Sequence, residues 1–555
     1  MDSLFPWHIK PHPKEAKELR RAILDFYGIL NLSVTLVFIP LLVCWFGRLH
    51  RRNLSSSDKL SRWVYLSHWS LSRPFLPSLP RVGSRKSWLF GTIWVVYITF
   101  MTISTTGDDY FHLTKRTAHI ATSLFPIQYL LSSRFLLQHL SLLTHQTHET
   151  LNKPHRWIGR TVYVLLSLHG VLYTFYFLTT ERGYRLLHWD VVFGLMGLII
   201  MNSIFVTSLA KYRDVAYRSF LGVHQLLSIL VLPVAWFHVV DTRRYVLLAG
   251  GVYVLDRVGR YYSTTSSKAR ITSVSSTAID LRTTDATDNK KIYAGSHYYI
   301  SIPNNPHSRG NPFTLSSSEN GMKFLIRTKA NFTRSLKDLA ADTTTVTLEG
   351  PYGIASCFPG FQFFDSFVFI TGGIGITMTF SVLKDLVAHV EEMSRGGVDV
   401  KFVWAVGGVD DAAWPLGELS AATAVGCSLD VDIYISHHGG EERVSMELDD
   451  LVEEDSHSLL PTHNDGNNNV TKDMRSLEKQ IESLKYRYAR TPISPRIQTG
   501  RPDLVRVVEG VCKEWGGGRK VAVFVCGPEG MGRDVRRALG GYHREGTVWV
   551  WEERF

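Results

Sequence analysis

Two stretches decide the fold of this chain: H-R-W-I-G-R-T-V-Y-V-L-L-S-L-H, from His155 to His169, and H-Q-L-L-S-I-L-V-L-P-V-A-W-F-H, from His224 to His238. After Arg160 the first stretch has no Asp, Glu, Lys or Arg, and the second has none at all. The two stretches belong to apolar runs at about 157–177 and 220–240, each close to the roughly 20 residues that cross a bilayer as an α-helix. Ionisable side chains at that depth are costly and usually functional, so the histidines are the first candidates for chemistry.

Both pairs of histidines are separated by 14 residues. In an α-helix this spacing is a rise of about 21 Å and a rotation about 40° short of four turns, so each pair faces roughly one direction at two depths. One span between the two helices makes them run in the same direction, so His155 can meet His224 and His169 can meet His238. Paired imidazoles at two levels are what two bis-histidine haems require. The alternative is that these histidines pack or form hydrogen bonds between helices.

Further apolar runs predict an α-helical membrane bundle of about seven spans. The loop between Arg48 and Lys86 has nine Lys or Arg residues and only Asp58 in opposition. By the positive-inside rule this loop is cytosolic, which places the C-terminal half in the cytosol as well. The polar, charged residues 1–21 do not predict a cleavable signal peptide. The predicted spans are 26–46, 88–105, 117–133, 157–177, 191–209, 220–240 and 245–258.

The chain has 555 residues and a net charge of +11, a balance that also occurs in nucleic-acid-binding proteins. Much of the excess lies in loops beside apolar runs, so it favours membrane topology and lipid contact, and we expect no nucleic-acid partner. The five cysteines include no C-x-x-C pair, which argues against a disulfide framework or a cysteine metal site.

The C-terminal half has a different pattern. Short β-type runs at 298–302, 322–326 and 345–348 are separated by Gly, Pro and Asn turns, which predicts a small antiparallel barrel. From Phe367 a strand, a glycine loop and a helix alternate with further strands, as in a parallel α/β sheet with a nucleotide at its strand ends. The polar stretch 456–498 predicts a disordered insertion in that sheet domain.

The run H-R-W-I-G-R from His155, the repeated histidine spacing and D-R-V-G-R from Asp256 resemble the ferric reductase transmembrane family, which includes the NADPH oxidases. The resemblance extends from about Thr117 to Phe555 apart from the polar insertion. It implies four haem-iron ligands, His155 with His224 on an inner b-type haem and His169 with His238 on an outer one. Arg156 and Arg160 are candidates to neutralise haem propionates, and anchoring in lipid headgroups is the alternative.

The resemblance also implies a ferredoxin-reductase-like module after the bundle. The expected divisions are an N-terminal tail with two spans at 1–110, a haem-binding transmembrane domain at 111–262, an FAD-binding barrel at 263–365 and an NAD(P)H-binding α/β domain at 366–555.

Two motifs in the barrel segment resemble the family's flavin site: N-P-F-T-L-S-S from Asn311, where the family usually has H-P-F-T, and E-G-P-Y-G from Glu349. Pro312 fixes the backbone so that Phe313 and Thr314 can contact the flavin ring and ribityl chain. Asn311 replaces the family's histidine and keeps hydrogen-bonding capacity. An ordinary strand and turn is the alternative. The predicted FAD-binding residues are Asn311, Pro312, Phe313, Thr314, Ser316, Gly350, Pro351 and Gly353.

Two further motifs resemble the family's nicotinamide-nucleotide site. In I-T-G-G-I-G-I-T, from Ile370, the glycines permit close approach of a pyrophosphate to a helix N-terminus that Thr377 would cap. The motif C-G-P-E-G-M resembles the one beside the nicotinamide, although Cys526 alone would more often be a buried small hydrophobe. The predicted NAD(P)H-binding residues are Gly372, Gly373, Gly375, Thr377, Arg501, Cys526, Gly527 and Pro528.

The chain closes with W-E-E-R-F, and a terminal aromatic in this superfamily stacks on the flavin until the nicotinamide displaces it. Phe555 and Glu553 match that position, with plain packing as the alternative for Phe555. The residues expected nearest hydride transfer are Thr314, Cys526, Glu553 and Phe555. A 2′-phosphate needs basic or hydroxyl donors, and Arg501 and Ser436 are candidates, which favours NADPH over NADH.

The order of these sites predicts electron transfer from cytosolic NADPH through FAD and two haems to an external acceptor. The leading acceptor is chelated ferric iron, with Cu²⁺ as a further one, in reductive iron uptake at the plasma membrane. The enzymatic alternative is an NADPH oxidase that forms superoxide from oxygen. An alternative of another class is a haem-binding membrane protein with a regulatory nucleotide sensor. The sequence identifies neither an external iron-binding residue nor a protein partner.

Overall fold

The structure is a computed structural model that divides into two compact units, Met1–Tyr262 and Ser263–Phe555. It describes residues 14–38, 40–41, 67, 70–71, 75, 84–144, 148–275, 277–284, 295–303, 310–318, 321–328, 332–339, 343–353, 360–392, 397–413, 427–436, 467–488, 494–515, 519–540 and 548–554.

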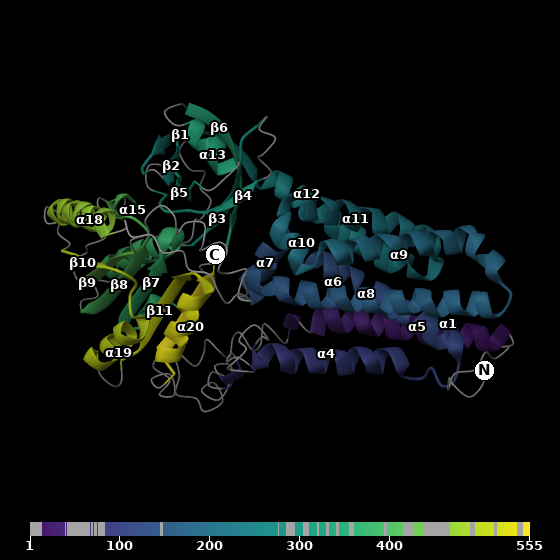
Figure 1. The fold of residues 1–555 in the computed structure, drawn as a ribbon. Helices are drawn as coiled ribbons and strands as arrows, with labels where there is room; N and C mark the ends of the chain where they lie inside the picture. Colours follow the sequence, from purple (N-terminus) through teal and green to yellow (C-terminus); the bar gives the residue numbers. More distant parts are fainter. Residues whose placement is uncertain are drawn as a thin grey trace. The chain divides into compact units, whose positions relative to one another are not determined.

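The first unit is a bundle of long helices that lie side by side (Figure 1). The longest of the described helices is α8, whose 32 residues extend for about 48 Å, well beyond the roughly 30 Å of a bilayer's hydrocarbon core. Described helices are α1 (Lys14–Ser33), α4 (Arg85–Ile103), α5 (Tyr110–Ser123), α6 (Phe125–Leu130), α7 (Phe135–Thr144), α8 (His148–Thr179), α9 (Trp189–Thr207), α10 (Ala210–Val215), α11 (Tyr217–His238) and α12 (Arg243–Tyr262).

The surface of this unit is apolar, as a lipid-facing bundle requires. Side chains such as Val96, Phe100, Val171 and Leu178 are exposed along α4 and α8. Among the described residues, five helices are long and apolar enough to cross a membrane, and α4, α8, α9 and α11 are four of them. The prediction of seven spans is therefore not confirmed.

Helix α5 is enclosed by the rest of the bundle although its sequence is polar. Its N-cap is Asp109, whose carboxylate accepts hydrogen bonds from the backbone N–H groups of Phe111 and His112. Its C-cap is Leu124. Pro126 follows in the first turn of α6, and because proline has no backbone N–H it cannot extend the hydrogen bonds of α5. This enclosed helix supplies main-chain contacts to the centre of the bundle.

The second unit begins with a nearly closed antiparallel barrel in the order β4-β3-β6-β1-β2-β5 among its described strands. Alternate side chains fill its interior, including Ile271, Tyr298, Ile300 and Leu348. Its elements are β1 (Thr264–Ser273), β2 (Ala278–Thr283), β3 (His297–Ser301), β4 (Asn311–Thr314), β5 (Lys323–Arg327), α13 (Phe332–Asp338) and β6 (Thr343–Tyr352).

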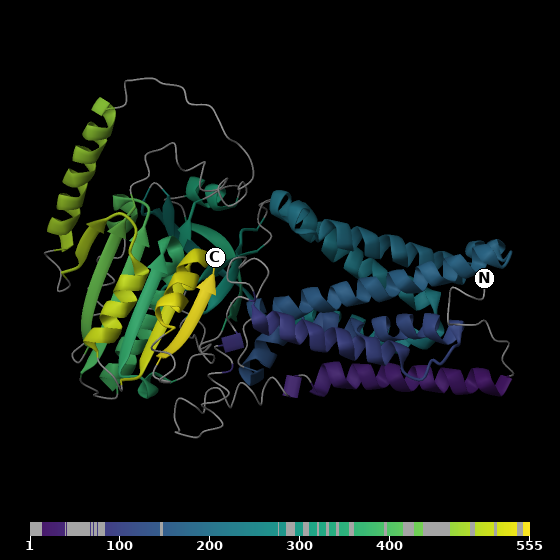
Figure 2. The ribbon, with the colours of Figure 1, turned by 60° about the horizontal axis from the view of Figure 1, so that its bottom comes forward.

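A parallel sheet follows in the order β10-β9-β8-β7-β11-β12, as far as the described residues define it, and Figure 2 shows α19 and α20 on one of its faces. Its central strand β7 is mostly apolar and is buried up to its last residue, as expected between two helical layers. The elements are β7 (Ser366–Gly372), α14 (Ile376–Glu392), β8 (Val398–Val406), α15 (Val409–Ala413), β9 (Cys427–Ile435), β10 (Arg496–Thr499), α19 (Leu504–Glu514), β11 (Val521–Gly527), α20 (Glu529–Ala538) and β12 (Val548–Arg554).

The fifth apolar helix, Gly373–Glu392, includes α14 and belongs to this sheet domain. Phe380, Leu383 and Leu386 are buried on it, and it packs on β7 and β11, so it is a core helix.

The sequence predicts disorder over 456–498, and this is wrong for part of the segment. Residues Asn467–Tyr488 form helix α18, and β10 begins at Arg496. Ile481, Leu484 and Tyr488 recur at helical spacing on one buried face, and the Tyr488 hydroxyl donates to the carbonyl of Ala412 at 3.0 Å. This apolar stripe is too short to stand out from the polar residues around it.

Candidate functional site

The structure brings the four predicted histidines together as two facing pairs between α8 and α11. The ring centres of His155 and His224 are 6.4 Å apart, and those of His169 and His238 are 6.3 Å apart. The pairs lie at two levels of the bundle because each helix separates its own two histidines by almost four turns.

Each of the four rings has its Nδ1 atom within hydrogen-bond distance of an oxygen on a neighbouring helix or its end. The distances are 3.2 Å from His155 to the Gln128 carbonyl, 2.8 Å from His169 to the Thr114 carbonyl, 2.6 Å from His238 to the Asp190 carbonyl and 3.1 Å from His224 to the Ser208 hydroxyl. A carbonyl oxygen can only accept, so Nδ1 carries the hydrogen in those three rings. Nε2 is then the lone-pair nitrogen, as in histidines that ligate metals.

The ring separation fits one iron between each pair. Two metal–imidazole bonds of about 2.0 Å, with about 1.1 Å from each nitrogen to its ring centre, place the ring centres roughly 6 Å apart. The side-chain amide of Gln128 lies 3.4 Å from Nε2 of His155, so it would have to turn away on ligation. The donor set, tautomers and spacing therefore suit two bis-histidine haems.

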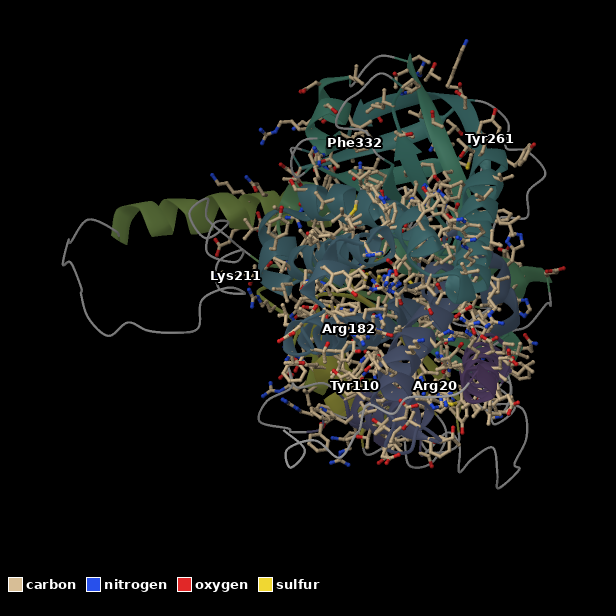
Figure 3. All side chains as sticks on the ribbon, turned by 90° about the vertical axis from the view of Figure 1, so that its right-hand side faces the viewer. Arg20, Tyr110, Arg182, Lys211, Tyr261 and Phe332 are labelled. Carbon is tan, nitrogen blue, oxygen red and sulfur yellow. The ribbon has the colours of Figure 1, made fainter. Side chains whose placement is uncertain are left out.

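The pair of His169 and His238 lies near an aromatic end of the bundle. Tyr173 has its ring centre 5.0 Å from that of His169, and Tyr110 donates a hydrogen bond to the carbonyl of Leu172 at 2.6 Å. Figure 3 looks onto this end, where Arg20, Tyr110 and Arg182 are labelled. The Arg182 guanidinium lies 5.8 Å from the centre of the Tyr176 ring.

Arg156 and Arg160 are exposed near the other end of α8, a position compatible with both propionate and headgroup contacts. Among the described residues, no group of three or more His, Cys, Asp or Glu side chains is placed to hold a metal ion.

The flavin motifs meet on β3, β4 and β6. His297 pairs with Thr314 on one side and with Tyr352 on the other, so these three side chains share the face opposite the barrel core. The ring centres of His297 and Tyr352 are 6.1 Å apart. A Cβ at Gly353 would lie only 3.0 Å from Nδ1 of His297, which explains why a glycine occurs there.

The other predicted flavin residues are divided between the two faces of the barrel wall. Phe313 packs against the core, with its ring 6.3 Å from that of Phe332, whereas Thr314 lies on the opposite side. Ser316 is completely buried, and among the described residues its hydroxyl has no hydrogen-bond partner. Gly350 and Pro351 lie in β6, and Gly350 lies directly beside the ring of Tyr298. Burial raises the pKa of that tyrosine to about 12.

The glycine loop and the C-G-P motif lie directly against each other at the carboxyl ends of β7 and β11. A Cβ at Gly372 would be 3.0 Å from Cδ of Pro528, and one at Gly527 would be 3.3 Å from the backbone nitrogen of Gly372. Gly373 has a φ of +50°, which favours glycine. Cys526 is fully buried and its carbonyl accepts a 3.3 Å hydrogen bond from Thr371.

Two side chains hold the glycine loop from within. The indole N–H of Trp404, on the neighbouring strand β8, donates to the carbonyl of Gly373 at 3.0 Å. The Thr377 hydroxyl donates to the carbonyl of Ile374 at 3.0 Å, so it braces the loop and does not cap the helix. The sequence does not single out Trp404, His297 or Ser208, because the contacts of each depend on partners distant in the chain.

Ser436 and Arg501 follow β9 and β10 at the same edge of the sheet as the glycine loop. The Ser436 hydroxyl donates to the Val406 carbonyl at 3.2 Å, and Arg501 is exposed. At the opposite end of β10, Arg496 bonds Asp432 at 2.7 Å, which raises the pKa of this arginine and pins the strand that leads to Arg501. Phe555 lies outside the described residues, and so does the side chain of Glu553 in β12.

Three family profiles match successive parts of the chain. The ferric reductase like transmembrane component matches residues 117–235, an FAD-binding domain matches 263–356 and the ferric reductase NAD binding domain matches 364–539. Together with the apolar helices, these matches identify a multi-pass membrane protein with FAD- and NAD(P)-binding domains.

Individual relatives are more distant. The chain is 26% identical to "Ferric reduction oxidase 3, mitochondrial" of Arabidopsis thaliana over 43% of this chain and 35% of that protein. It is 23% identical to "Ferric/cupric reductase transmembrane component 2" of Saccharomyces cerevisiae over 75% of this chain and 57% of that protein. The matches thus span about a third to three fifths of these relatives.

Among solved structures, the "Ferredoxin reductase in carbazole 1,9a-dioxygenase" is 15% identical over 52% of this chain and 69% of that chain, with a TM-score of 0.31, too low to establish a shared fold. The three successive profiles, from transmembrane component to NAD binding domain, carry the assignment: the chain belongs to the ferric reductase transmembrane family.

Proposed function

We propose that this protein carries electrons from cytosolic NADPH through FAD and two b-type haems to chelated ferric iron on the other side of a membrane. The observation that carries the proposal is the pair of facing imidazoles at each of two levels, with ring centres 6.4 and 6.3 Å apart. Histidines that served only in packing would not need the same distance between ring centres in both pairs. They would also not need an oxygen atom beside Nδ1 in each of the four rings.

FAD, when bound, takes two electrons together and releases them singly, and each haem carries one electron at a time. His155 with His224, and His169 with His238, would hold the two irons. Thr314, His297 and Tyr352 present the face on which the flavin would lie. Gly372, Gly373 and Gly375 allow a pyrophosphate to approach the N-terminus of α14.

The proposed orientation rests on the distribution of charge. The segments 153–160 and 211–218, beside His155 and His224, are basic, which favours the cytosol. His169 and His238 then lie on the outer side, at the plasma membrane if the protein supports iron uptake. For the nucleotide, Ser436 and Arg501 would bind a 2′-phosphate, which supports NADPH as the donor.

The name of the yeast relative, a ferric/cupric reductase, supports a metal acceptor, with Cu²⁺ as a second substrate. A superoxide-forming oxidase would also reduce ferric iron, but indirectly. Capture of Fe²⁺ by a chelator in the presence of superoxide dismutase separates the two functions: direct reduction survives the dismutase, and reduction through superoxide does not.

The transfer path is tested with His169→Ala and His238→Ala in protein reconstituted into sealed vesicles. We expect NADPH to reduce the flavin at the wild-type rate, because the nucleotide and flavin residues are unchanged. Reduction of a ferric chelate on the other side should be lost. Undiminished transmembrane reduction in either variant would contradict the assignment.

A further inference from the structure

One of the four histidines differs from the others in what holds it. His155, His169 and His238 are each opposed by a main-chain carbonyl, whereas the Nδ1 atom of His224 lies 3.1 Å from the side-chain hydroxyl of Ser208. Ser208 is the residue at which α9 ends, and its side chain is half-buried.

A hydroxyl can donate or accept, so the Ser208 contact alone does not fix the tautomer of His224. A second bond does. The Ser208 Oγ lies 2.6 Å from the carbonyl of Ile204, to which it can only donate. Its single hydrogen is used there, so Oγ must accept from Nδ1–H of His224. Nε2 of His224 is thereby left as the lone-pair nitrogen of a ring whose centre lies 6.4 Å from that of His155.

We propose that Ser208 is a positioning residue that fixes the tautomer of His224 and tunes the reduction potential of the inner haem. The inference rests on the proposed haem ligation. A hydrogen bond from Nδ1–H raises the basicity of a ligating imidazole, which favours ferric over ferrous iron. Because this acceptor is a side chain, it can be removed by substitution without altering the backbone, unlike the three carbonyls.

The test is a potentiometric titration of both haems in purified, FAD-loaded protein. Ser208→Ala removes the acceptor, Ser208→Thr keeps a hydroxyl, and Ser203→Ala is the control. Ser203 is also half-buried on α9, and its hydroxyl donates to the carbonyl of Ile199 at 2.9 Å, as that of Ser208 does to Ile204. Among the described hydrogen bonds it contacts no histidine.

We expect Ser208→Ala to raise one midpoint potential and to leave the other unchanged. At a fixed ambient potential, the ferric-to-ferrous ratio of that haem should fall about three- to tenfold. For a one-electron couple this fall corresponds to a rise in midpoint potential of about 30 to 60 mV. Ser208→Thr and Ser203→Ala should keep both wild-type values. Loss of one haem in Ser208→Ala, with both retained in Ser208→Thr and Ser203→Ala, would also support the role of the hydroxyl.

Two results would overturn the inference: unchanged potentials in Ser208→Ala with both haems present, or equal changes in all three variants. These differ from failure of the proposed function, in which wild-type protein itself contains no haem.

Discussion

Gly194→Ala is expected to dislodge the haem proposed between His169 and His238, because helix α9 passes very close to His238 at this glycine. A Cβ at position 194 would lie 2.6 Å from Cε1 and 2.9 Å from Nδ1 of the His238 ring. Both distances are shorter than a carbon makes with a neighbouring ring, so the ring or the helix must move. The His238 ring cannot move without weakening its 2.6 Å contact with the Asp190 carbonyl.

The cost follows from the geometry. Inserting one methyl group into a packed site typically costs about 1–3 kcal/mol, here concentrated on one ligand ring. Gly197→Ala is the matched control, one turn further along α9. A Cβ there would meet only Cγ1 of Val234, at the ordinary distance of 3.5 Å. It adds the same methyl group and should leave the haem site intact.

The assay is the number of haems per chain in purified protein, measured together with NADPH-dependent reduction of an external ferric chelate. In Gly194→Ala the haem content should fall from two per chain toward one, and reduction of the external ferric chelate should be lost. NADPH should still reduce the flavin of this variant. If it retained two haems and full reduction, as Gly197→Ala should, the placement of His238 as a ligand would be refuted.

Three further predictions concern the second unit, Ser263–Phe555. Trp404→Phe removes the N–H bond to Gly373, worth about 0.5–1.5 kcal/mol, so the KM for NADPH should rise about 2- to 12-fold with kcat nearly constant; an unchanged KM would argue against a positioning role. Asp432→Asn leaves the buried Lys401 ammonium with Asp430 as its carboxylate partner, so the unit should lose about 1–3 kcal/mol of unfolding free energy. The loss should be seen as release of FAD at a lower temperature. Burial raises the pKa of Cys512 to about 11, so this thiol should resist alkylation at pH 8 in folded protein and react after denaturation, as mass spectrometry can show.

The sequence predicts the order of the domains and the two sets of facing histidines because these depend on local periodicity and fixed spacing. A spacing of 14 residues determines the relative direction of two side chains on one helix without knowledge of the partner helix. The motifs of the glycine loop and of C-G-P were likewise visible as strand ends of a parallel sheet.

The rest depends on contacts between distant residues. Nothing around Ser208 or Gly194 in the sequence shows that each faces a histidine of α11. Phe313 and Thr314 were both expected at the flavin, yet adjacent residues of a strand point to opposite faces, and Phe313 packs on the core. The sequence does not predict helix α18 because most of its residues are polar, and the buried residues Ile481, Leu484 and Tyr488 form only a short apolar stripe among them.

The most direct measurement is the haem content and optical spectrum of purified, FAD-loaded protein before and after anaerobic addition of NADPH. We predict two b-type haems per chain, both reduced by NADPH, and their loss on replacing the histidines of either pair. Folded, FAD-loaded protein that contained no haem after expression with ample haem supply would contradict the account.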